Sequence, residues 1–154
     1  MFPYHATGGY EASRRILKGL NAKSVLDIPC GWGRNTAWLS DDKDYLGVDI
    51  DENAIKQLQL RFPFAKTLVA DVTTWTPDEP FDLAFIQCFF YTKIAGLDSA
   101  SSFPFQNLRK WADTILIFDT GPNTWRKKMK ANDWMILRQE GPFEEGDSWV
   151  ELWV

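Results

Sequence analysis

The chain has 154 residues, of which 45% are hydrophobic and 15% aromatic, so its composition suits one globular domain with one core. Its formal net charge of −4 argues against a dedicated nucleic-acid binder, which usually carries a basic face. No apolar run approaches the roughly 20 residues of a membrane span, and the start does not resemble a signal peptide.

Residues 1–22 precede the first predicted strand and consist of an arm followed by a helix. Residues 1–9 are rich in aromatic residues and glycine, which predicts an irregular arm. Over 10–20 the less polar residues recur at helical spacing and form one stripe: Tyr10, Ser13, Ile16, Leu17 and Leu20. A helix is therefore expected here, with Thr7 as its cap.

The next stretch, 24–36, is the strongest signal in the chain. An apolar run over 23–28 predicts a strand that ends in an acid, Asp27, and a turn with Gly31 and Gly33 follows. A short helix over about 34–40 is expected next. A strand, a glycine turn and a helix start bring backbone N–H groups together, and a ligand can approach them closely.

The spacing of this turn separates two ligand classes. A dinucleotide fold requires Gly-x-Gly-x-x-Gly, but the third glycine position is Thr36. Asp27 would also repel a pyrophosphate. An acid in this place suits a ligand that brings positive charge, such as the ammonium and sulfonium of S-adenosylmethionine.

Residues 25–34, Val-Leu-Asp-Ile-Pro-Cys-Gly-Trp-Gly-Arg, resemble motif I of the class I S-adenosylmethionine-dependent methyltransferases. The family pattern is Asp/Glu-x-Gly-x-Gly-x-Gly, and Pro29 stands at its first glycine. Proline fixes φ near the extended value, so we expect the turn to survive. The resemblance implies an α/β, Rossmann-like fold: a doubly wound, mostly parallel seven-stranded sheet with helices on both faces and a C-terminal antiparallel hairpin. It also implies a cofactor site at this turn, formed by Asp27, Pro29, Cys30, Gly31, Gly33, Asn35 and Thr36.

The second strand, 45–48, runs into Asp49 and Ile50. An acid at the end of this strand is well placed to accept hydrogen bonds from both ribose hydroxyls of an adenosine. Asp49 therefore matches the acid of the family's motif II, with Ile50 beside it. Asp51 is instead expected to cap the helix that starts at Glu52.

The third strand, 66–70, is followed by Asp71 and Val72. In the resembled family an acid here can bind the adenine amino group, and the next backbone N–H can reach a ring nitrogen. The alternative for Asp71 is a turn-starting residue. The carboxyl end of the fourth strand, 81–88, includes Gln87, and we expect this end to face the methyl group. It lacks the Asn/Asp-Pro-Pro-Tyr motif of enzymes that methylate exocyclic amines of bases.

The last third predicts a loop over 92–102, a helix from Pro104, a strand over 114–118 and a helix over 123–131. A closing hairpin of 134–137 and 148–154 is expected after them, with Gly141 and Pro142 between its strands. The aromatic residues 89–91 and Trp32 either line the methyl-transfer cavity or pack in the core. A catalytic base stays unassigned, with His5 and Asp119 as candidates whose alternatives are a tail residue and a turn residue. The spacing of Cys30 and Cys88 fits neither a zinc site nor a disulfide framework, which favours no metal and a cytoplasmic location.

The sequence thus predicts an S-adenosylmethionine-dependent methyltransferase acting on a small-molecule or small-peptide acceptor, with no membrane partner. Three alternatives stay open: a cofactor-binding module without activity, an enzyme that methylates RNA or protein docked through the basic run 126–130, and aminopropyl transfer on the same fold. A nicotinamide-dependent oxidoreductase is disfavoured by Asp27 and the missing third glycine. The sequence assigns no oligomeric state.

Overall fold

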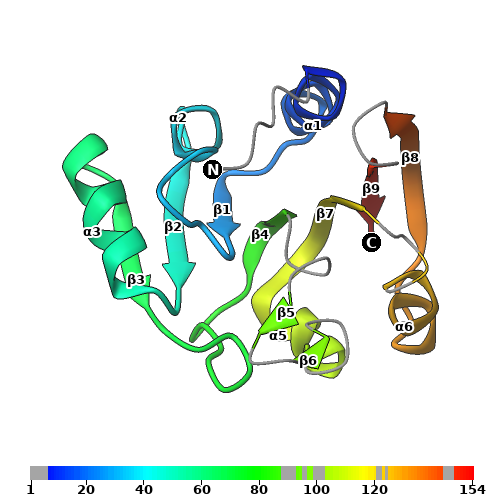
Figure 1. Cartoon of the computed structure of the whole chain (residues 1–154). Helices are drawn as coiled ribbons and strands as arrows, with labels where there is room; N and C mark the ends of the chain where they lie inside the picture. Colours follow the sequence, from blue (N-terminus) through cyan, green and yellow to red (C-terminus); the bar gives the residue numbers. More distant parts are fainter. Residues whose placement is uncertain are drawn as a thin grey trace.

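The computed structural model describes residues 7–87, 93–94, 97–98, 103–120, 123, 125–143 and 148–154. These ranges contain a seven-stranded sheet with the order β3-β2-β1-β4-β7-β9-β8, and a separate pair, β5-β6 (Figure 1). The strands of the large sheet are β1 (Ser24–Asp27), β2 (Asp44–Asp49), β3 (Lys66–Val69), β4 (Phe81–Gln87), β7 (Ala112–Thr120), β8 (Ile136–Phe143) and β9 (Ser148–Trp153). The first five of these are parallel, whereas β9 is antiparallel to both β7 and β8. The predicted parallel sheet with a closing hairpin is confirmed.

Helices cover both faces of this sheet, as expected for a doubly wound fold. They are α1 (Thr7–Gly19), α2 (Thr36–Leu39), α3 (Glu52–Arg61), a 3-10 helix η1 (Phe105–Asn107), α5 (Leu108–Trp111) and α6 (Arg126–Ala131). In Figure 1, α1 and α2 lie above the row of strands, and α5 and α6 lie below it. Two separate apolar clusters correspond to these two faces, one built with α1 and one with α5 and α6.

The central strand β4 explains why both faces must be covered. Its residues from Leu83 to Ile86 are fully buried, and their side chains alternate between the two clusters. Leu83 and Phe85 join the cluster under α1, while Ala84 and Ile86 join the one under α5 and α6. Burying each large apolar side chain contributes about 1.5–3 kcal/mol, so a continuous apolar strand is stable only between two layers.

The first helix begins earlier than predicted. The expected irregular arm over 1–9 is helical from Thr7 onwards, and residues 1–6 lie outside the described ranges. The cause is tertiary packing. A Cβ added at Gly9 would lie 2.2 Å from Phe118 Cζ, and one at Gly8 would lie 2.8 Å from Phe143 Cδ1. The two glycines thus let the helix start lie directly against β7 and β8.

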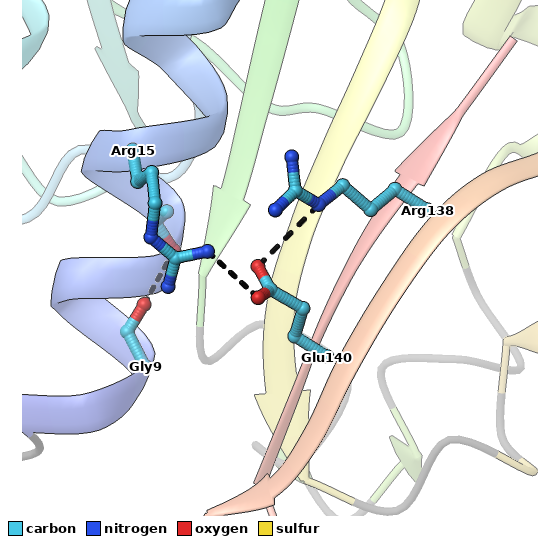
Figure 2. A network of polar contacts seen from close by, with 5 residues as sticks. Gly9, Arg15, Arg138 and Glu140 are labelled. Carbon is cyan, nitrogen blue, oxygen red and sulfur yellow. Dashed lines mark hydrogen bonds and ion pairs between the residues drawn. The ribbon is translucent and has the colours of Figure 1, made fainter.

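A polar contact also joins α1 to the C-terminal hairpin. Arg15 Nη1 lies 2.7 Å from Glu140 Oε1 on β8, and Arg138 Nε lies 3.6 Å from Glu140 Oε2. Figure 2 shows Arg15 reaching from the helix to the carboxylate on the strand. The first helix and the closing hairpin are therefore held together although they are distant in sequence.

The second half of the chain differs from the prediction in four places. Gly141 and Pro142 were expected between the hairpin strands but lie within β8, at a register irregularity between Glu140 and Phe143. The helix after Pro104 begins with a 3-10 turn, and the helix over 123–131 begins only at Arg126. Within the expected loop 92–102, β5 (Lys93–Ile94) and β6 (Leu97–Asp98) pair in antiparallel fashion, and the rest lies outside the described residues.

Candidate functional site

The glycine turn after β1 has the backbone shape that the sequence predicts. Gly31 and Gly33 have φ angles of +55° and +90°, which favour glycine, and the Ile28–Pro29 peptide is cis. A Cβ at Gly31 would meet nothing within 4 Å. One at Gly33 would lie 3.0 Å from Leu58 Cγ. Gly31 thus leaves open space where a ligand can approach the backbone, whereas Gly33 lets the turn pack on α3.

Asp49 fastens this turn to the end of β2. Its Oδ2 accepts a hydrogen bond from the Gly31 N–H at 2.8 Å, and its Oδ1 accepts one from the Asp51 N–H at 3.0 Å. The side chain is only 8% exposed. Each carboxylate oxygen keeps a second lone pair, so this position also suits hydroxyl donors on a ligand. The expected ribose contact stays a prediction.

Asp27 lies at the carboxyl end of β1 and is 1% exposed. The Tyr45 hydroxyl donates to its Oδ2 at 2.7 Å, and the hydroxyls of Tyr45 and Thr36 lie 3.0 Å apart. Burial raises the pKa of Asp27 to about 7, the Tyr45 hydrogen bond opposes that rise, and the nearby charge of Asp49 adds to it. A positive charge close by would therefore favour its ionised form.

Cys30 has a structural position within the turn. Its N–H donates to the Val48 carbonyl at 3.0 Å, and its buried side chain packs with Ile55 and Leu58 of α3. Burial, and then the charges of the two nearby acids, raise the pKa of the thiol above its ordinary value. Cys30 is thus a neutral thiol. The expected role of Cys30 in cofactor binding stays a prediction. Its backbone suits that role, whereas its side chain is used for packing.

A chain of amide hydrogen bonds joins the turn to the end of β4. The Trp38 indole N–H donates to Asn35 Oδ1 at 3.1 Å, and Asn35 Nδ2 donates to Gln87 Oε1. Gln87 Nε2 in turn donates to the Tyr10 hydroxyl at 2.9 Å. Asn35 and Gln87, both predicted as site residues, are therefore brought together. The contribution of Tyr10 was missed, because its place on the α1 stripe indicated only packing.

The predicted adenine end combines one exposed and one buried apolar side chain with the acid Asp71. Ile50 is 60% exposed directly after Asp49, and Val72 is buried. Asp71 Oδ1 accepts hydrogen bonds from the Thr73 N–H at 2.9 Å and the Thr73 hydroxyl at 2.7 Å. The turn-starting alternative for Asp71 is thus seen in the structure, while its contact with adenine stays a prediction.

Several other candidates are now placed or lie outside the described ranges. The predicted aromatic wall 89–91, Cys88 and His5 are not among the described residues. Asp119 is buried within β7, where it pairs with Trp149 of β9, and its Oδ1 accepts the Thr120 N–H at 2.7 Å; its role as a base stays a prediction. Trp32 is 66% exposed beside the open face of the turn.

Part of the basic run 126–130 takes part in packing. Arg126 Nε lies 2.6 Å from Oε2 of the fully buried Glu151, whose Oε1 accepts the Trp125 indole N–H at 2.7 Å. Lys128 Nζ lies 5.5 Å from the centre of the Phe105 ring. These contacts weaken the case for a free docking face on this helix. In the described part of the chain, no cluster of metal-ligating side chains occurs, and no helix is long and apolar enough to cross a membrane.

The residues present fit an adenosine ligand with a cationic tail. The open backbone at Gly31 admits a close approach, and Asp27 has no neighbouring cation among the residues that the structure describes. Asp49 and Ile50 follow in the order that a nucleoside needs. A pyrophosphate fits poorly, because both acids face the turn where its charge would lie.

Comparisons with known proteins agree with this assessment. A family model described as "Methyltransferase domain" matches residues 25–108, more than half of the chain. The chain is 35% identical over 69 residues to a trans-aconitate 2-methyltransferase of Rhizobium rhizogenes, covering 43% of this chain and 27% of that protein. It is 30% identical over 74 residues to the trans-aconitate 2-methyltransferase of Afipia carboxidovorans, covering 46% and 29%. The matched part thus spans less than a third of the length of these curated relatives.

Several solved structures with the same fold are methyltransferases. An S-adenosylmethionine-dependent methyltransferase from Mesorhizobium loti superposes with a TM-score of 0.75 at 14% identity, covering 96% of this chain and 99% of that one. The N-methyltransferase NodS of Bradyrhizobium japonicum, in complex with S-adenosyl-L-homocysteine, gives 0.73 at 14% identity over 98% and 87%. The magnesium protoporphyrin IX methyltransferase of Synechocystis, with bound cofactor, gives 0.76 at 14% identity over 97% and 79%. At these identities the likeness establishes the fold.

Proposed function

The chain belongs to the methyltransferase-domain family of class I S-adenosylmethionine-dependent enzymes, and from this premise we propose that it transfers a methyl group from S-adenosylmethionine to a small-molecule acceptor. The observation that carries the proposal is the hydrogen bond between the Gly31 N–H and Asp49, made beside the buried Asp27. It joins the ends of β1 and β2 into one ligand-binding edge. We take residues 1–154 as one cofactor-binding domain.

Each end of this edge has a proposed role in holding the cofactor. Asp27 attracts the ammonium group, and the backbone of the turn from Pro29 to Gly33 approaches the amino-acid part. Asp49 accepts the ribose hydroxyls, which suits a carboxylate at the end of a second parallel strand. The adenine ring lies against Ile50 and Val72, with Asp71 near its amino group. The exposed side chain of Ile50 supports this placement, because a flat ring would cover it.

Methyl transfer requires little from the protein beyond the alignment of the two reactants. S-adenosylmethionine, when bound, supplies a methyl group that is already activated by its positively charged sulfur. The chain then has to hold the two reactants in line and exclude water from them. The amide chain from Asn35 to Gln87 supports this role, since it fixes the end of β4 next to the turn. This end of the sheet is the proposed place of methyl transfer.

The names of relatives support a small acceptor. The curated relatives are named for trans-aconitate, and a structural neighbour for magnesium protoporphyrin IX. A carboxylate acceptor is already ionised at neutral pH, so its methylation requires no general base. A small carboxylic acid is therefore our first choice of acceptor, and it agrees with a site for which we assign no base.

Thermal melts with S-adenosylmethionine, S-adenosylhomocysteine and NADH test the cofactor. At about 100 times its dissociation constant a ligand adds about 2.7 kcal/mol, or roughly 5–10 °C for a domain of this size. A shift with both adenosylated ligands and none with NADH is expected, and no shift with either would overturn the proposal.

Turnover with labelled cofactor and a panel of small carboxylic acids tests the acceptor. A chain that binds cofactor and makes no S-adenosylhomocysteine with any small molecule would be an inactive binding module or one that acts on macromolecules.

A further inference from the structure

Tyr45 reaches Asp27 along β2 by lying over a glycine. Tyr45 pairs with Val25 in the register of β1 and β2, while Asp27 pairs with Gly47. Residues 45 and 47 share a face of the strand, so the tyrosine side chain must pass Gly47 to reach the acid. A Cβ at position 47 would lie 2.8 Å from the Tyr45 hydroxyl. The hydroxyl can take this place only because residue 47 lacks a side chain.

The hydrogen bonds of Tyr45 have a defined direction when Asp27 is ionised. The phenol has one proton, and it is donated to Asp27 Oδ2 at 2.7 Å. The Tyr45 oxygen must then accept from the Thr36 hydroxyl, which lies 3.0 Å away at the start of α2. Tyr45 on β2 and Thr36 on α2 together therefore hold Oδ2 of Asp27 in place. Among the described residues Asp27 Oδ1 accepts no hydrogen bond, so this oxygen is left for a ligand.

The surroundings of Asp27 contain no positive charge within the described part of the chain. The titratable groups that act on it are Tyr45 and Asp49 from β2 and the Cys30 thiol from the turn. The strand on its other side, β4, pairs it with Phe85, which does not titrate. An ionised carboxylate in such a place is stabilised chiefly by the Tyr45 hydroxyl and, once bound, by a cationic ligand.

Resting on the proposed function, we propose that Tyr45 is a positioning residue that holds the Asp27 carboxylate ionised and oriented for the ammonium group of the cofactor. Thr36 and Gly47 complete the arrangement: one orients the tyrosine hydroxyl and the other makes room for it. A structural role for Tyr45 alone would predict loss of stability without any change in how cofactor binding depends on pH.

The pH dependence follows from the charge of the acid. Because the pKa of Asp27 is about 7, affinity for S-adenosylhomocysteine should fall as the pH drops below that value, approaching tenfold for each pH unit. Removing the Tyr45 hydroxyl removes a hydrogen bond to the charged form, which moves the midpoint upward by about one pH unit. At pH 7 the ionised fraction then falls from about one half to about one tenth, so affinity falls about fivefold.

The experiment is calorimetric titration of S-adenosylhomocysteine from pH 5.5 to 8.5 into the wild type, Tyr45→Phe, Gly47→Ala and Asp27→Asn. The Tyr45→Phe variant keeps the ring, and Gly47→Ala keeps the tyrosine but crowds its hydroxyl. Both should shift the midpoint upward and return to within about twofold of wild type at pH 8.5. Asp27→Asn should bind weakly with no midpoint. The control ligand is 5′-methylthioadenosine, which lacks the ammonium and should bind all four proteins with the same flat profile.

Two results would overturn the role of Tyr45. One is a Tyr45→Phe profile that superposes on that of wild type. The other is an equal loss at every pH for both ligands, which would mean general damage to the site. Failure of the proposed function has a different signature, because the wild type would then bind neither adenosylated ligand at any pH.

Discussion

The two glycines of the turn offer a pair of substitutions with opposite expected effects. Gly33→Ala places a methyl group 3.0 Å from Leu58 Cγ and 3.1 Å from Thr36 Oγ1, at a φ of +90°. Gly31→Ala places one in open space, at a φ of +55° that other residues adopt at moderate cost. We expect the first to damage the fold and the second to damage the site.

The magnitudes follow from these environments. At Gly33, backbone strain of about 1–3 kcal/mol adds to about 1–3 kcal/mol for overpacking, so about 2–6 kcal/mol of stability is lost. This corresponds to a melting temperature lower by roughly 4–24 °C. At Gly31 only about 1–2 kcal/mol of strain applies. A methyl group against the bound cofactor costs about 1–3 kcal/mol there, or roughly 5- to 150-fold in affinity.

Thermal melts of the ligand-free variants measure the loss of stability, and calorimetric titration with S-adenosylhomocysteine measures the loss of affinity. Gly19→Ala is the matched control, because a Cβ at this exposed position at the end of α1 meets nothing within 4 Å. It should bind the ligand as the wild type does. Wild-type affinity in Gly31→Ala would refute the close approach of the cofactor to the turn. Equal melting temperatures for the two turn variants would refute the packing role of Gly33.

Three further predictions concern buried carboxylates. Asp49→Ala should weaken S-adenosylhomocysteine binding by about 1.5–3 kcal/mol in calorimetry, and unchanged affinity would exclude the ribose contact. The free protein should lose stability as pH rises from about 4 to 7 in urea denaturation, because native Asp27, with its pKa of about 7, holds a proton that the unfolded chain releases; Asp27→Asn should remove this part of the slope. Glu151→Ala should cost about 3–5 kcal/mol in the same assay, since it leaves Arg126 and Trp125 without their buried partner, and a cost below about 1 kcal/mol would contradict the pairing.

Features that depend on neighbouring residues could be predicted from the sequence. Asp51 was expected to cap α3, and its Oδ1 accepts from the N–H groups of Asn53 and Ala54. The first three strands were found because each is an apolar run that ends at an acid or directly before one. The turn at Gly31 was found in the same way. These signals are local, so no tertiary contact is needed to read them.

The missed features depend on contacts between distant segments. Tyr10 reaches Gln87 across 77 positions, and Tyr45 reaches Asp27 across 18. Tyr10 lies in a helical stripe that indicated packing, and Tyr45 opens the predicted strand 45–48. Nothing near either in the sequence marks its hydroxyl as part of a site. The early start of α1 was missed for a similar reason, because Gly9 indicates an irregular arm until Phe118 is brought against it.

The tryptophans of this chain provide two optical signals that can be separated. Four indoles, at positions 111, 125, 134 and 153, are at most 2% exposed in the core, so their emission should shift to longer wavelength only when the fold opens. Trp32 is 66% exposed at the glycine turn, where a bound ligand would lie near it. An iodide or acrylamide titration should therefore reach Trp32 most readily in the folded protein and leave the four core indoles unquenched, with the half-buried Trp38, Trp75 and Trp149 in between. Fluorescence from a single unlabelled sample can then follow ligand binding through the readily quenched component and unfolding through the shift of the core component.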